Sequence, residues 1–154
     1  MTISPRTGCV ELPDSDFRVC PDTTLAALIE GPDRASWKRE SLPGQFTRRI
    51  ARAGYPMVIF RVAFDNNGRL SWISIFFDDP PAGSGWDDWS EADELLRKER
   101  QEVLLRSTLG PPSVKDNGAS PVGAMIWKFA WGAVYSVYDQ RASFSSVEVR
   151  FANA

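Results

Sequence analysis

Apolar and polar residues alternate most regularly in the last third of the chain, in three runs at residues 125–131, 133–138 and 144–151. A period of two is typical of β-strands, whose successive side chains point to opposite faces. Gly132 and residues 139–142 supply turn residues between the runs. The pattern predicts a three-stranded antiparallel meander. On the first strand Trp127, Phe129 and Trp131 are expected to share one face, and on the last strand Val147, Val149 and Phe151 are expected to face inward.

A second pair of alternating runs, 57–64 and 70–77, is joined by residues 65–69, which contain Asn67-Gly68. Asn-Gly between two apolar runs is the strongest short signal for a β-hairpin. One face of the first strand is expected to carry Val58, Phe60, Val62 and Phe64, and the other Ile59, Arg61 and Ala63. We therefore expect a hairpin that is buried on one side.

Two helices are predicted. Asp22-Thr23-Thr24 offers capping side chains to residues 25–30, and Gly31-Pro32 ends that segment. Ser90 begins a longer helix that ends at about Leu109, before Gly110. Its apolar stripe is expected to comprise Leu95, Leu96, Val103, Leu104 and Leu109. Its solvated face is expected to comprise Glu94, Arg97, Lys98, Glu99, Arg100, Gln101 and Glu102.

The remaining segments lack clear periodicity. Residues 1–16 are expected to be extended, with a short edge strand at 9–12. Residues 37–52 are basic and interrupted by Pro43-Gly44, which favours a surface loop or a short surface helix, and residues 113–123 are expected to form a loop. Residues 78–90 combine Pro, Gly, Trp and acidic residues and are interpreted as a linker.

These elements predict an α+β fold of two layers, an antiparallel sheet with helices packed on one side. The chain of 154 residues fits a single domain. The order of a short helix ending at Gly-Pro, a polar segment and antiparallel strands occurs twice. We therefore consider two similar units in tandem, 17–79 and 90–151, joined by the acidic linker 78–90.

Composition narrows the functional classes. The net charge of −2 does not suggest a nucleic-acid-binding surface, so no direct nucleic-acid partner is expected. No apolar run is long enough to cross a membrane, and the N-terminus lacks the apolar core of a signal peptide, which predicts a cytoplasmic protein without a membrane partner. Cys9 and Cys20 are most simply two free thiols, although they could pair in an oxidising compartment.

Histidine is absent, which removes the commonest general base and metal ligand, so neither a metal nor another cofactor is expected. Asp78, Asp79, Asp87 and Asp88 could form a catalytic pair or bind a divalent cation, but acids in a Pro/Gly-rich loop are usually solvated. We expect no enzyme and no catalytic residue.

Seven acidic residues lie within residues 78–94, next to two tryptophans. Such a segment suits a contact surface, because tryptophan supplies a rigid anchor and carboxylates attract cationic groups of a partner. We expect partner contacts from Asp78, Asp79, Trp86, Asp87, Asp88, Trp89, Glu91, Asp93, Glu94, Trp127 and Trp131. The alternative is that Trp86 and Trp89 cap the core and that the strand aromatics, including Trp127 and Trp131, lie inside it.

The charged helix followed by Leu109-Gly110-Pro111-Pro112, with the segments 126–132 and 135–139, resembles small bacterial immunity proteins of interbacterial toxin systems. The layout is also similar to the tandem helix-plus-sheet units of β-lactamase inhibitor protein and of small outer-membrane-assembly lipoproteins. The resemblance covers residues 75–151 best. The chain departs from the lipoproteins, since it has neither signal peptide nor lipobox.

The resemblance implies a protein that binds a cognate toxin and occludes its active site without catalysing a reaction. An acidic patch would suit a toxin with a basic active site, such as a nuclease. The alternative is a structural or scaffold domain that self-associates through the aromatic face of its sheet.

Overall fold

The computed structural model describes residues 1–11, 17–52, 55–78, 90–116, 124–139 and 144–152. The predicted linker at 79–89 therefore lies outside the described residues. The described elements, in chain order, are β1 (Thr2–Ile3), β2 (Val10–Glu11), β3 (Arg18–Val19), α1 (Leu25–Glu30), a 3-10 turn η1 (Arg34–Ser36), β4 (Lys38–Arg39), β5 (Gln45–Arg52), β6 (Tyr55–Phe64), β7 (Leu70–Asp78), α2 (Glu91–Leu109), β8 (Val114–Asp116), β9 (Ala124–Phe129), β10 (Gly132–Asp139) and β11 (Phe144–Phe151).

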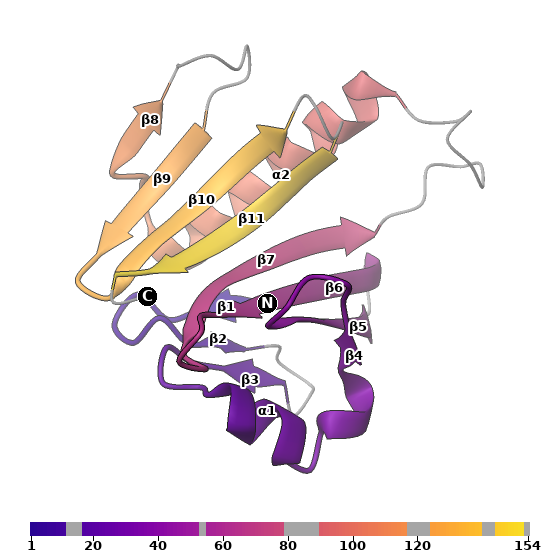
Figure 1. Ribbon diagram of the computed structural model, residues 1–154. Coiled ribbons are helices and arrows are strands. Elements are labelled where there is room, and N and C mark those ends of the chain that lie inside the picture. The colour runs from indigo at the N-terminus through magenta and orange to yellow at the C-terminus, as the bar shows by residue number, and fades with distance from the viewer. Residues whose placement is uncertain (12–16, 53–54, 79–89, 117–123, 140–143, 153–154) are drawn as a thin grey trace.

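The fold is built on an eight-stranded antiparallel sheet in the order β4-β5-β6-β7-β11-β10-β9-β8 (Figure 1). Each half of the chain contributes four consecutive strands, and the two sets meet where β7 pairs with β11. The predicted hairpin and the predicted meander are confirmed as β6-β7 and β9-β10-β11. The α+β class is likewise confirmed. The tandem repeat remains a prediction, because the helix that precedes the strands has six residues in the first half and nineteen in the second.

One face of the sheet is covered. Val58, Phe60 and Val62 of β6 are fully buried. Ile75 and Ile73 of β7, which lie directly opposite Phe60 and Val62, are fully buried as well. The small sheet β1-β2-β3 and α1 cover this half, and α2 covers β10 and β11 (Figure 1). The expected burial of the hairpin on one side is confirmed, and all covering elements share a single core.

The small N-terminal sheet contains a disulfide between Cys9 and Cys20. These cysteines flank the paired residues Val10 and Val19 of β2 and β3, so the strand pairing itself brings the sulfur atoms together. The expectation of two free thiols is therefore wrong. The cysteines are eleven positions apart in the sequence, and that spacing does not show that β2 and β3 pair.

Two sequence expectations about loops are also wrong. The basic segment 37–52 contains strands β4 and β5, not a surface loop or helix. The alternation of apolar and polar residues is not visible in this segment, because an arginine occupies each face: Arg48 lies on the covered face and Arg49 on the other. Arg48 stays there because its guanidinium packs on Phe17 and bonds Asp33. Part of the expected loop 113–123 is strand β8.

Both helices begin where the sequence predicts. The backbone N–H of Ala27 donates to the Thr24 hydroxyl, and that of Asp93 donates to the Ser90 hydroxyl, each at 3.1 Å. Helix α2 ends at Gly110, whose positive φ of 78° suits glycine. Among the described residues, no helix is long and apolar enough to cross a membrane.

Candidate functional site

The second face of the eight-stranded sheet is open in the described part of the chain. Residues directly opposite each other in an antiparallel pair point to the same side, so one residue from each strand forms a continuous row across this face. From β4 to β8 the row is Lys38, Thr47, Arg61, Ser74, Glu148, Tyr135, Ile126 and Val114. We call this surface the open face.

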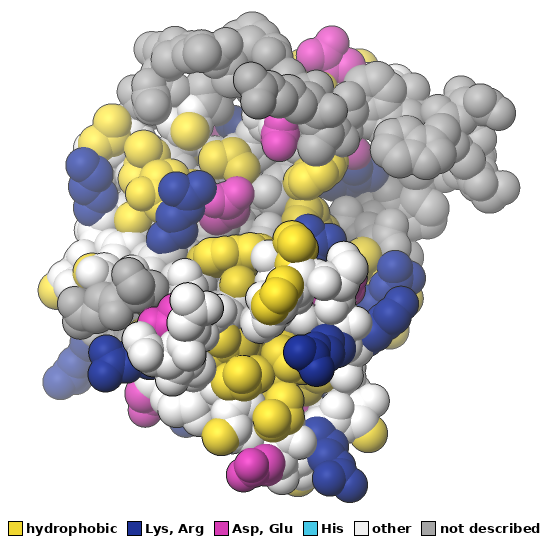
Figure 2. All heavy atoms as spheres, viewed as in Figure 1, with side chains coloured by type: hydrophobic (Ala, Val, Ile, Leu, Met, Phe, Trp, Pro, Cys, Tyr) yellow, Lys and Arg dark blue, Asp and Glu magenta, His cyan; other side chains and the backbone are white. Residues whose placement is uncertain are grey.

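The open face is hollowed at its centre, over β6, β7, β11 and β10. The hollow has a volume of about 470 Å³. Its walls combine three aromatic residues, Trp72, Phe76 and Phe144, with four charged ones, Arg61, Asp139, Glu148 and Arg150. Phe76 meets Phe144 edge-on with ring centroids 5.1 Å apart. Small serines form the floor, where Ser74 and Ser146 are buried between larger neighbours. Figure 2, drawn from the same side as Figure 1, shows hydrophobic side chains in patches at mid-height, below it and at the upper left, with Lys and Arg between them and along the edges.

Two arginines stand over aromatic rings of this surface. The guanidinium of Arg61 lies 5.4 Å from the ring centroid of Phe76, and that of Arg150 lies 4.8 Å from that of Tyr135. Arg150 also pairs with Glu148 at 2.6 Å. Arg61, unlike Arg150, has no ion pair among the described residues, and its Nε is buried and makes no hydrogen bond. A convergence of aromatic rings and arginine is typical of binding surfaces.

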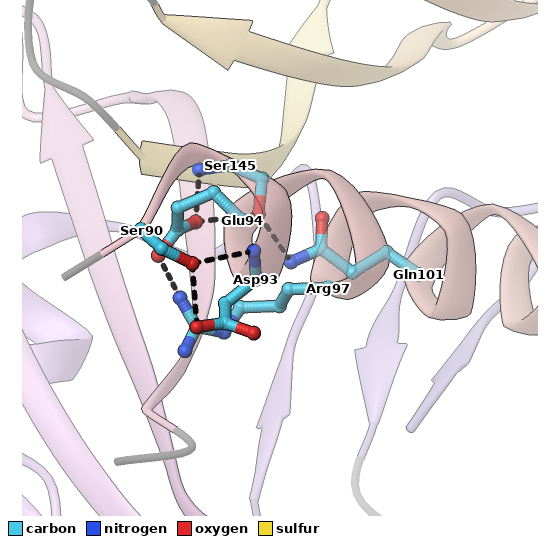
Figure 3. A network of polar contacts seen from close by, with 6 residues as sticks. All are labelled: Ser90, Asp93, Glu94, Arg97, Gln101 and Ser145. Atoms are coloured by element: carbon cyan, nitrogen blue, oxygen red, sulfur yellow. Dashed lines mark hydrogen bonds and ion pairs between the residues drawn. The ribbon is translucent and has the colours of Figure 1, made fainter. Parts of the chain in front are cut away.

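On the covered face, α2 meets the sheet through polar groups. Its buried residues are Glu94, Lys98, Gln101, Glu102 and Leu105. The Glu94 carboxylate accepts hydrogen bonds from the backbone N–H and the hydroxyl of Ser145, at 2.9 and 3.1 Å, and pairs with Arg97 (Figure 3). We call the polar contacts that α2 makes through Glu94, Lys98, Gln101 and Glu102 the polar seam.

Further along the polar seam, Lys98 pairs with Glu102, which Ser136 approaches to 3.4 Å. Near the start of α2, the Tyr138 hydroxyl lies 3.5 Å from Glu91. Burial, with a smaller effect of the Glu91 charge, raises the pKa of Tyr138. The expected facing of α2 is wrong in part. Leu104 and Leu109 of the predicted apolar stripe pack on the core, but Leu96 and Val103 are exposed, and Glu94, Lys98, Gln101 and Glu102 of the predicted solvated face are buried.

The acids expected to contact a partner fall into two groups. Glu91 and Asp93 are exposed at the start of α2, whereas Glu94 is buried in the polar seam. Asp79, Trp86, Asp87, Asp88 and Trp89 lie outside the described residues, and Asp78 ends β7 with its side chain outside them. The structure thus describes Glu91 and Asp93 as the acids of this set that face solvent.

The two strand tryptophans lie on the covered side. Trp127 is 1% exposed, and its indole N–H donates to the carbonyl oxygen of Gly110 at 2.9 Å. Trp131 lies in the turn between β9 and β10, stacks on Phe129 and donates to the carbonyl oxygen of Pro5. Trp127 follows the core alternative, and Trp131 holds the N-terminal turn against the meander.

The residues that form the hollow were not singled out from the sequence. Trp72, Phe76 and Phe144 are spread over two strands that are distant in the chain and become neighbours only through the β7-β11 pairing. The alternation placed Arg61 on the other face of its strand from Val62, but Ile59 and Ala63 share the face of Arg61, so the sequence did not show which face is open. Among the described residues, no cluster of three or more potential metal ligands occurs.

No family model matches the chain, and no curated protein matches its sequence. One solved structure is similar in fold: a chain of the complex described as Rhs1-CT with its cognate immunity protein RhsI1. The TM-score is 0.61 at 14% sequence identity, and the match covers 100% of this chain and 88% of that chain. At this identity the likeness shows the fold alone.

Proposed function

We propose that this chain is an immunity protein, which binds a cognate bacterial toxin and neutralises it by occluding the toxin's active site. The observation that carries this proposal is the fold likeness over the whole chain to a member of a toxin–immunity complex. Neutralisation by occlusion needs a stable interface and no bond-making step, so the protein acts as a binder and not as an enzyme.

The open face supports this proposal physically. A stable protein complex buries about 800 Å² on each partner, with aromatic and arginine anchors near the centre. The eight-stranded sheet supplies a continuous surface, and its hollow places Trp72, Phe76 and Arg61 near the centre of it. A sheet is also a rigid platform, which lowers the entropy lost on binding.

The acidic segment 78–94 remains a second proposed contact. Its exposed acids Glu91 and Asp93 would attract a toxin with a basic active site, such as a nuclease, and no direct contact to nucleic acid is needed. Charge reversal at Asp87 and Asp88 should weaken toxin binding while thermal stability stays nearly unchanged. A large loss of thermal stability would show instead that this segment is structural.

The compartment is part of the proposal. We proposed a cytoplasmic location from the sequence, but a disulfide such as Cys9–Cys20 is typical of oxidising compartments. Fractionation of the native cell, followed by thiol labelling with and without a reductant, decides between the two. Labelling of both cysteines before reduction would place the protein in a reducing compartment.

The function is tested by co-expression. The protein encoded beside this chain is expressed in a sensitive host, alone and together with this chain. We expect growth arrest in the first case and full growth in the second, together with a stable one-to-one complex in light scattering. Growth arrest that persists in the presence of this chain would contradict the proposal.

The alternative is a scaffold domain that self-associates through its aromatic sheet face. One observation favours this alternative: Trp72 and Phe76 on the open face are partly exposed in the single chain, and a second copy could cover them. Light scattering of the purified protein separates the two functions. A monomer at tens of micromolar that becomes a heterodimer with the toxin supports immunity, whereas a concentration-dependent homodimer supports the scaffold.

A further inference from the structure

We infer that the open face is the toxin-docking surface and that its hollow receives an acidic side chain of the toxin, flanked by apolar residues, on the guanidinium of Arg61. This inference rests on the proposed function. It also locates the anchor on a basic part of the sheet, separate from the acidic segment 78–94.

The state of Arg61 is the first observation. Its side chain is half-buried, with the guanidinium held against Phe76, and the Nε atom is buried without a hydrogen bond. No ion pair of Arg61 is found among the described residues. A charged guanidinium without an acidic partner is available to a carboxylate of another protein, which would bind its terminal nitrogens.

The local charge is the second observation. The positions around Arg61 on the open face are two along its own strand and three on each neighbouring strand. They are Ile59, Ala63, Gln45, Thr47, Arg49, Trp72, Ser74 and Phe76. None of these side chains is acidic, and Arg49 adds a second positive charge. Lys38 extends the positive charge to the edge strand, on the same row. Charge complementarity therefore calls for an anionic group on the partner.

The walls of the hollow distinguish a protein partner from nucleic acid. Trp72, Phe76 and Phe144 offer apolar contact next to Arg61, which suits a carboxylate placed between apolar side chains. The opposite wall carries two acids, Asp139 and Glu148, of which Glu148 is paired with Arg150. An anion therefore fits only close to Arg61, which a single carboxylate can do, whereas successive phosphates would also reach the acidic wall. The net charge of the chain, −2, also disfavours a nucleic-acid partner.

The test uses the full chain and the protein encoded beside it, purified in a catalytically inactive form. Binding kinetics are measured at several salt concentrations for wild type, Arg61→Gln, Arg61→Lys and the control Arg39→Gln. Arg39 lies on the same edge strand as Lys38 but points to the other side. Arg39→Gln therefore removes the same charge from the chain without touching the open face.

For Arg61→Gln we expect an increase in Kd of about thirty-fold or more, with a weaker dependence of the association rate on salt. Arg61→Lys should recover only part of the affinity, because lysine keeps the charge but loses the two-pronged geometry of the guanidinium. Arg39→Gln should bind like wild type. The thermal midpoint of Arg61→Gln should be unchanged or higher, because the substitution removes an unpaired buried N–H.

Three outcomes overturn the inference. Wild-type affinity in Arg61→Gln would show that the toxin docks elsewhere, while leaving the immunity function intact. Absence of binding by the wild type would overturn the immunity function together with this inference. Binding of a 20-nucleotide single-stranded DNA, or self-association, that Arg61→Gln abolishes would assign the hollow to a different occupant.

Discussion

Two regions cover the same face of the eight-stranded sheet, one through apolar side chains and the other largely through polar ones. The N-terminal cap, which we define as β1–β3 and α1, packs through apolar side chains, and Phe17, next to β3, lies 4.0 Å from Phe60 of β6 between ring centroids. Helix α2 packs on β10 and β11 through the polar seam, and Leu105 is the apolar member of its buried residues. Helix α2 therefore covers the sheet with a mixed face, in which buried polar side chains lie beside Leu105, Leu104 and Leu109.

The difference has an energetic meaning. Burying an apolar side chain stabilises the fold by about 1.5 to 3 kcal/mol. A buried ion pair is close to break-even, because the desolvation of both charges offsets their attraction. The N-terminal cap should therefore supply stability, whereas the polar seam should supply a unique position for α2. Substitutions in each region test this difference in energy.

The largest effect is expected from Phe17→Ala in the N-terminal cap. Phe17 is 2% exposed, and its loss leaves a cavity between the cap and β6. We expect the free energy of unfolding to fall by about 4 kcal/mol in urea titration. The control is Leu42→Ala, at an exposed position, which should change it by less than about 0.5 kcal/mol. Equal effects of the two substitutions would show that the cap contributes little to stability.

The polar seam should respond differently to single and paired changes. Glu102→Gln leaves the buried Lys98 ammonium without its carboxylate and should cost about 3 kcal/mol. The double variant Lys98→Met with Glu102→Leu removes both charges at once, so its stability should stay within about 1 kcal/mol of wild type or exceed it.

Urea titration of both variants checks this contrast, with Glu99→Gln on the exposed side of α2 as the control. A double variant that is less stable than the single one would mean that the ion pair stabilises the fold outright. In that case the polar seam would match the N-terminal cap in energy, and the contrast between them would disappear.

The same contrast explains what could be predicted from the sequence. The hairpin β6-β7 and the meander β9-β10-β11 were predictable, because their apolar residues recur with a period of two and are buried on that pattern. The bounds of α2 were predictable from Ser90 and Gly110. Its facing was not, because hydropathy assigns charged residues to solvent and cannot show that Glu94 and Lys98 find partners inside.

The candidate site was harder to predict for a different reason. From the sequence we predicted partner contacts at Trp127 and Trp131, whereas Arg61 was placed with Ile59 and Ala63 on one face of its strand without a functional role. The hollow, however, combines β6 and β7 with β10 and β11, and pairing between strands so distant in the chain leaves no local signal. Trp127 and Trp131 drew attention because they are tryptophans, yet they pack on the covered side.

A smaller effect than that of the buried charge is expected from the disulfide of the cap. Cys9→Ser with Cys20→Ser removes a cross-link between residues eleven apart, which should lower the free energy of unfolding by about 2 to 3 kcal/mol. The wild type in a reductant should lose the same amount, and the double variant should not respond to the reductant. A reductant effect that persists in the double variant would have to arise outside this disulfide.

The smallest effect is expected from Tyr138→Phe at the edge of the polar seam. The long 3.5 Å contact with Glu91 should contribute less than about 1 kcal/mol at pH 7. Burial, and then the Glu91 charge, raises the pKa of Tyr138 above 10.0, so the folded protein holds this proton where the unfolded chain releases it. That stability is fully present below pH 10 and is lost as the pH rises through the raised pKa.

Urea titrations between pH 8 and 11 should therefore show a steeper alkaline decline for wild type than for Tyr138→Phe. Parallel declines would mean that the phenol is solvated in the folded protein and lies outside the polar seam.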